Sequence, residues 1–76
     1  MKPERLKEIR LGLGISAARM GRLFGYAGTE ESAAVTIRKY ESGMLPVPPA
    51  LARLALMYHM HGVPEGWFDR WGKFDL

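Results

Sequence analysis

The segment Ser16-Ala-Ala-Arg-Met-Gly-Arg-Leu-Phe-Gly25 and, after a polar stretch, the segment Thr36-Ile-Arg-Lys-Tyr-Glu-Ser-Gly43 decide the fold of this chain. Each carries apolar residues at the spacing of one helix face and closes with a glycine, a residue that readily ends a helix. Ser16 stands where its side chain can cap the first helix. The buried stripe expected of that helix consists of Met20, Leu23 and Phe24. We therefore expect two short amphipathic helices joined by a glycine-bearing turn.

The second of these helices has an inner and an outer face. Gly28 and Thr29 suit a loop and a cap at its start. Ala33, Ile37 and Tyr40 recur at i, i+4 and i+7, so they are expected to face the core. The residues expected to point mostly outward are Ala34, Val35, Arg38, Lys39 and Ser42.

Two further helices are predicted on either side. Residues 3–13 begin with Pro and Glu, which suit a first turn, and are followed by Gly14, which suits a left-handed stop. The prolines within residues 44–49 predict an extended connector, because each fixes its own φ and disfavours helix before it. Residues 50–61 then form a helix that is apolar nearly all round, and residues 64–71 can add one or two turns.

The sequence thus predicts an all-α protein, a compact bundle of four to five helices. Residues 1–62 are expected to form the main domain and residues 63–76 an aromatic C-terminal extension. Gly21 lies where a neighbouring helix would need to approach closely. A chain of 76 residues has room for one domain, and its 47% hydrophobic and 25% charged residues are typical of an ordered globular protein.

Charge and cysteine content narrow the functional classes. The net charge of +3 modestly favours a polyanionic partner, and the excess of positive charge lies before residue 54. With 0 Cys, neither a disulfide nor a thiolate metal site is available, which fits a reducing compartment. The longest apolar stretch is too short to span a bilayer. We therefore expect a cytoplasmic protein without a membrane partner.

Several segments occur in an order that resembles the helix-turn-helix domain of the phage repressor and Cro type, the XRE family, with its lambda-repressor-like fold. The matching segments are Leu6-Lys-Glu-Ile-Arg10, Gly14-Ile-Ser16, Leu23-Phe-Gly25, Thr36-Ile-Arg-Lys-Tyr-Glu-Ser-Gly43 and Pro48-Pro-Ala-Leu-Ala-Arg-Leu54. The resemblance covers roughly residues 6–56. It implies a domain that binds operator DNA, usually as a symmetric dimer, with its third helix in the major groove. An unrelated helical hairpin is the alternative.

The resemblance also implies which residues touch DNA. Contacts to base edges would come from Ala34, Val35 and Lys39, and contacts to phosphates from Thr36 and Ser42. The cationic side chains of Arg19, Arg22 and Arg38 would add salt-dependent affinity. A lysine can donate to guanine O6 and N7, and a small apolar side chain can pack on a thymine methyl. The alternative for Arg38 and Lys39 is an ordinary solvated face.

Two departures from the family pattern stand out. About six residues are inserted between Gly25 and Tyr40, so the resemblance does not define the first residue of the helix expected to read DNA. The family commonly has a glutamine after the cap serine, where it bonds a phosphate, and this chain has Ala17. The contact at Ala17 is therefore expected to fall to backbone amides at the start of the helix.

Other polar residues receive structural interpretations. Similar domains place an ion pair at the positions of Arg10 and Glu41, and we expect one here. His59 and His61 are expected to be solvent-exposed, because an i, i+2 pair lies on opposite sides of a helix. Glu30-Glu31 is interpreted as two solvated carboxylates on a loop. We find no nucleophile constellation, phosphate-binding loop or dinucleotide fingerprint, so neither an enzyme nor a bound cofactor is expected.

Three aromatic residues, Trp67, Phe68 and Trp71, lie in the C-terminal extension. They either fold back on their own core or form a dimer interface, where tryptophan often anchors. The predicted function is sequence-specific binding of double-stranded DNA by a homodimeric transcriptional repressor. The alternative is an antitoxin-like protein-binding module whose C-terminal aromatics contact a partner protein.

Overall fold

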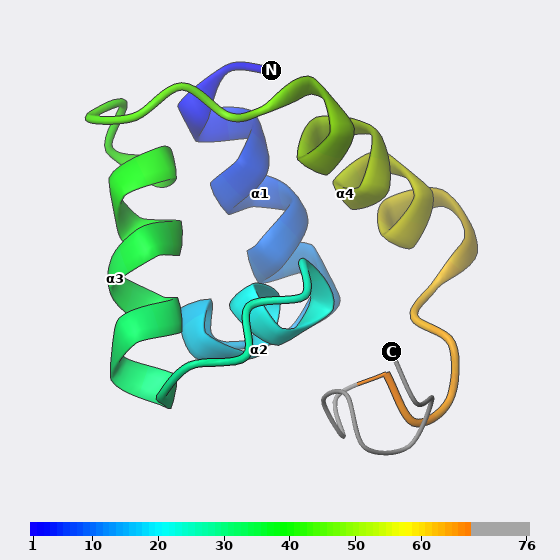
Figure 1. Cartoon of the computed structure of the whole chain (residues 1–76). Coiled ribbons are helices and arrows are strands. Elements are labelled where there is room, and N and C mark those ends of the chain that lie inside the picture. The colour runs from blue at the N-terminus through cyan, green and yellow to red at the C-terminus, as the bar shows by residue number, and fades with distance from the viewer. Residues whose placement is uncertain (68–76) are drawn as a thin grey trace.

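The computed structural model describes residues 1–67, and within them it contains four helices and no strand (Figure 1). The helices are α1 (Pro3–Leu13), α2 (Ala17–Leu23), α3 (Glu30–Glu41) and α4 (Pro49–His61). The predicted all-α bundle is confirmed. A short turn at residues 65–67 occupies the beginning of the segment in which one or two further turns were predicted, and Phe68 and Trp71 lie outside the described residues.

The ends of the helices follow the predicted caps. The Ser16 hydroxyl accepts a hydrogen bond from the amide of Arg19 at 3.2 Å, and the Thr29 hydroxyl accepts one from the amide of Ser32 at 3.1 Å. Each bond satisfies an amide that has no partner inside its own helix. Gly14 ends α1 with φ 72°, a left-handed conformation that glycine adopts without a steric cost. Because the Thr29 hydroxyl caps α3, it fixes the start of that helix at Glu30.

The core lies where α1, α2 and α3 meet. Leu6, Ile9, Met20 and Ile37 are its largest fully buried side chains. Tyr58 joins α4 to this core, because its hydroxyl donates a 2.7 Å hydrogen bond to the carbonyl oxygen of Leu23. Burial raises the pKa of Tyr58 to about 12.

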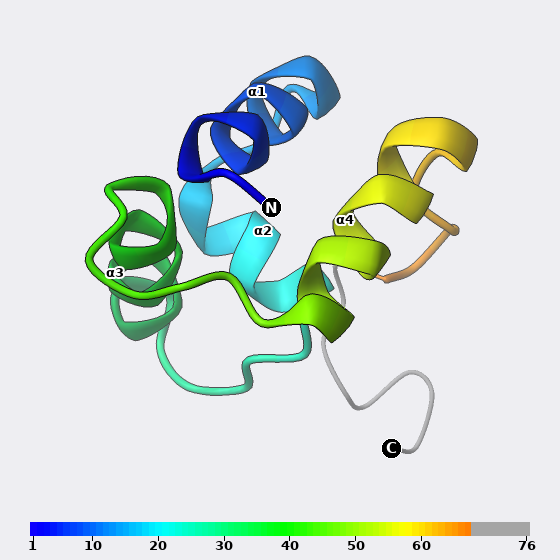
Figure 2. The ribbon, with the colours of Figure 1, turned by 90° about the horizontal axis from the view of Figure 1, so that it is seen from above.

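The helices are arranged so that α3 and α4 lie on opposite sides of α1 and α2 (Figure 2). Helix α3 packs against both α2 and α1, and α4 packs against α1. The contact between α2 and α3 depends on Gly21: a Cβ built at this position would lie 2.7 Å from the Cβ of Ala33. The close approach predicted at Gly21 is confirmed.

An ion pair connects the end of α1 to the end of α3. The Arg10 guanidinium donates from Nε to Oε2 of Glu41 at 2.7 Å and from Nη2 to Oε1 at 3.1 Å. Its Nη1 donates to the carbonyl oxygen of Ile15 at 3.1 Å. The side chains of Arg10 and Glu41 are 14% and 7% exposed, so this predicted pair is largely shielded from solvent.

None of the helices found in residues 1–67 has the length and apolar content needed to cross a membrane.

Candidate nucleic-acid interface

One side of α3 presents a continuous exposed surface. It is formed by Val35, Arg38, Lys39 and Ser42, which we call the α3 outer face. These positions follow one another at i, i+3, i+4 and i+7, the spacing of one helix face. Val35 is 41% exposed although it is apolar. The face thus combines two cations, one hydroxyl and one aliphatic side chain on a helix that the core holds from behind.

Ala34 does not belong to this face. It is only 6% exposed and packs in the hydrophobic core, so the prediction that it points outward to a base edge is wrong. The physical reason is that α3 packs against two helices at once, which widens its buried stripe beyond one residue per turn. Ala33 and Ala34 are both buried, so the buried surface of α3 includes two consecutive positions of the chain.

The two hydroxyls predicted to bind phosphates are engaged with the main chain. Thr36 donates its hydroxyl proton to the carbonyl oxygen of Ser32 at 3.2 Å. Ser42 donates to the carbonyl oxygen of Lys39 at 3.2 Å and accepts from the amide of Met44 at 3.4 Å. A hydroxyl has one proton to donate, so donation to a phosphate oxygen requires either group to exchange its present bond.

The inserted turn between α2 and α3 is tied to both helices. Arg22 donates from Nη1 to the carbonyl oxygen of Tyr26 at 2.8 Å. The Tyr26 hydroxyl lies 2.7 Å from the hydroxyl of Tyr40 on α3. Burial, together with this hydrogen bond, raises the pKa of Tyr26 to about 12. The sequence did not predict this role of Arg22 and Tyr26. The only sequence feature that indicates it is the length of the turn, because a long turn needs its own hydrogen bonds to hold α3 in one position.

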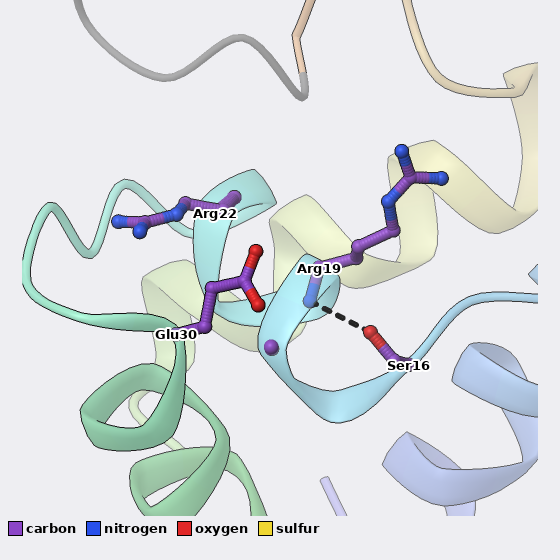
Figure 3. A pocket seen from close by; sticks show the side chains of 5 residues that line it. Ser16, Arg19, Arg22 and Glu30 are labelled. Carbon is purple, nitrogen blue, oxygen red and sulfur yellow. Dashed lines mark hydrogen bonds between the residues drawn. The ribbon is translucent and has the colours of Figure 1, made fainter.

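An open depression of about 310 Å³ lies beside α2 (Figure 3). It is lined by Ser16, Ala18, Arg19, Arg22 and Glu30. The side chains of Arg19 and Arg22 leave the helix in different directions, and the Glu30 carboxylate projects between them. A carboxylate in this position opposes the binding of a phosphate inside the depression. The two arginines therefore do not form a converging anion site.

Ala17 lies in the first turn of α2, and Glu30 and Glu31 lie in the first turn of α3. The Ala17 side chain is 7% exposed and faces the core, so only main-chain groups remain at that position for a ligand. Glu30 and Glu31 are exposed but belong to the first turn of α3, and their assignment to a loop was wrong. Carboxylates in a first turn stabilise a helix through its dipole, which explains their position.

The histidines of α4 are both exposed, as predicted. Within residues 1–67 no group of three or more potential metal-ligating side chains comes together.

Comparison with known proteins found no matching family model, no matching curated protein and no matching solved structure.

Proposed function

We propose that this protein binds double-stranded DNA sequence-specifically and acts as a transcriptional repressor, with the α3 outer face in the major groove. The observation that carries the proposal is the exposure of Val35 beside Arg38 and Lys39 on a helix fixed by its neighbours. An exposed aliphatic residue between cations suits a surface that meets both thymine methyl groups and polar base edges.

Three residues of the α3 outer face and two arginines of α2 have distinct roles in this proposal. Lys39 donates to guanine O6 and N7, and Val35 packs against a thymine methyl. Arg38 and, from α2, Arg19 neutralise phosphates and so supply affinity that depends on salt but not on sequence. Arg22 acts indirectly, because its hydrogen bond to Tyr26 holds the turn that leads into α3.

The acidic first turn of α3 adds a constraint. Near DNA, Glu30 and Glu31 are repelled by phosphates, whereas a carboxylate accepts a hydrogen bond from the amino group of cytosine. The pair therefore weakens binding to arbitrary duplex while leaving room for a cytosine within the preferred site. This balance favours discrimination over raw affinity.

We further propose that two copies bind together. A two-fold dimer places two α3 helices about one DNA turn, roughly 34 Å, apart on the same side of the duplex. Trp67 supports an interface at the C-terminal extension: its ring meets that of Tyr58 edge to face at 6.1 Å, and the residue as a whole is 39% exposed. The same exposed residue favours the second candidate, an antitoxin-like module that binds another protein.

The test is to select bound sequences from a random duplex pool and to titrate salt against binding to the selected and random sequences. DNA readout predicts that the selected site binds at least about 10³-fold more tightly than random duplex, and that both affinities fall steeply with salt. A module that binds only proteins shows no salt-dependent affinity for either duplex. That result would exclude the DNA-binding proposal.

A further inference from the structure

Helix α4 has an exposed apolar surface that the core does not use. Leu56, Met57 and Met60 are 38%, 58% and 70% exposed. Together with the exposed Arg53 they occupy positions i, i+3, i+4 and i+7, one face of the helix, which we call the α4 outer face. Isolated apolar residues on a surface are ordinary, but three on one helix face form a contiguous strip of the kind that marks an interaction site.

This strip lies away from the proposed DNA-binding surface. Helix α1 packs against both α3 and α4, and two perpendicular views place α3 and α4 on opposite sides of the bundle (Figures 1 and 2). A duplex against α3 therefore leaves the α4 outer face open. Binding at the α4 outer face does not require DNA at α3.

The charge of α4 indicates what kind of partner fits. The helix carries Arg53, His59 and His61, all exposed, and contains no Asp or Glu. If a second copy packed against the strip through the same face, cationic or ionisable side chains of the two helices would meet with no carboxylate from either helix to pair with them. A partner surface that surrounds an apolar stripe with carboxylates is instead complementary to the α4 outer face.

We propose that the α4 outer face binds an acidic amphipathic helix of another protein. The partner helix would place apolar side chains against Leu56, Met57 and Met60 and glutamate or aspartate side chains toward Arg53. Two of the three apolar residues are methionines, whose flexible side chains adapt to differently shaped apolar partners. The site thus recognises a class of helix, apolar on one face and acidic at its edges.

The test uses the full chain labelled with ¹³C in its methionine methyl groups, and a synthetic peptide of about 16 residues as the probe. The peptide carries leucines at i, i+3, i+4 and i+7 with glutamates beside them, and a control peptide replaces every glutamate by lysine. We expect the acidic peptide to shift the Met57 and Met60 methyl signals. Met44, which is 70% exposed on the connector, and the fully buried Met20 are internal controls that should not shift.

Variants test the chemistry of the site. Met60→Glu and Arg53→Glu are each expected to weaken the acidic peptide at least about tenfold, and Arg53→Glu should also strengthen the lysine peptide. Met44→Glu is the matched control, because Met44 is as exposed as Met60 but lies outside α4, and it should bind like the unmodified chain. Circular dichroism checks that each variant is folded. An unchanged DNA affinity of Met60→Glu would show that peptide binding at α4 and DNA binding at α3 use different surfaces.

Four results would overturn the proposal. Equal binding of the two peptides would show that the strip has no preference for acidic helices. Equal weakening by Met44→Glu would show that the loss of binding does not depend on the strip. Sedimentation that reveals a dimer abolished by Met60→Glu would assign the strip to a second copy. Nuclear Overhauser effects between the Met57 or Met60 methyl groups and the rings of Phe68 or Trp71 in the free chain would assign it to the chain's own C-terminal extension.

Discussion

Gly21 on α2 and Ala33 on α3 lie so close that a Cβ at position 21 would be 2.7 Å from the Cβ of Ala33 and 3.3 Å from its Cα and carbonyl oxygen. Two of these three neighbours are backbone atoms, so the helices would have to move apart to admit a methyl group. Overpacking of this kind costs about 1–3 kcal/mol, more than the gain of about 0.8–1 kcal/mol from replacing glycine by alanine in a helix. We expect Gly21→Ala to lower the free energy of unfolding in urea by about 1 kcal/mol.

The control for this prediction is Gly12→Ala. Gly12 lies in α1, and a Cβ at this position would meet no atom of another element within 4 Å, so the same substitution should raise stability by about 0.5–1 kcal/mol. The double variant Gly21→Ala/Ala33→Gly should recover part of the loss, since it removes the shortest contact. Equal effects of the two single substitutions would mean that the α2–α3 contact is looser than the structure describes.

The ion pair between Arg10 and Glu41 should contribute to stability as a coupled unit. Both side chains are largely buried, and removal of either partner leaves a charge with little access to water. We expect Glu41→Gln to cost about 3 kcal/mol, and Arg10→Met to cost more because it also removes the bond to the Ile15 carbonyl. A double-mutant cycle measured by urea unfolding should give a coupling energy of about 1–3 kcal/mol.

Arg5 and Glu8 provide the matched exposed pair, at 3.4 Å with side chains 43% and 67% exposed. The same cycle on this pair should give less than about 0.5 kcal/mol. If the Arg10–Glu41 coupling is equally small, the two charges act independently despite their geometry.

The fold could be predicted from the sequence because local signals agree with one another. Ser16, Thr29 and Gly14 mark helix ends by chemistry that acts within a few residues, and Ile37 and Tyr40 mark a buried face by spacing alone. The Arg10–Glu41 pair could be expected only through the family resemblance, because nothing local relates two residues on different helices. The structure confirms each of these expectations.

The candidate site was predicted less completely, because it depends on packing between elements. Ala34 is buried since α3 faces two helices, and periodicity cannot reveal how many neighbours a helix has. The sequence predicts a phosphate ligand at Arg22, whereas its side chain bonds to a carbonyl in the inserted turn, whose path no motif specifies. The exposure of Val35, Arg38 and Lys39 was predicted correctly, because helical spacing places all three on the side of α3 away from the buried Ile37 and Tyr40.

Tyrosine ionisation should make the protein sensitive to alkaline pH. The pKa values of Tyr26 and Tyr58 are raised from 10.0 to about 12, so the folded state retains protons that the unfolded chain releases near pH 10. The stabilisation from this difference is fully present below pH 10 and is lost as the pH rises toward 12. Urea unfolding across this range, with tyrosinate absorbance recorded in parallel, should show the free energy of unfolding falling as the tyrosines ionise.

Tyr58→Phe isolates one of the two groups. It removes the hydrogen bond to the Leu23 carbonyl, so the variant should be less stable than the unmodified chain near neutral pH, by about 1–3 kcal/mol. Because phenylalanine does not titrate, the difference between variant and parent should shrink between pH 10 and 12. A difference that stays constant across this range would show that Tyr58 ionises equally in the folded and unfolded states.

Lys39 is the residue on which sequence discrimination should depend most, since it is an exposed cation on the α3 outer face next to the apolar Val35. Lys39→Ala should weaken binding to the selected site by about 1–3 kcal/mol and relax the preference at one base pair, while random duplex binds nearly as before. Arg19→Ala, on α2, should instead weaken all sequences alike and reduce the salt slope by about 1. Fluorescence anisotropy with the selected duplex, single-base variants of it and random duplex measures both effects. Equal loss on selected and random DNA for Lys39→Ala would remove Lys39 from base readout and make it a phosphate ligand like Arg19.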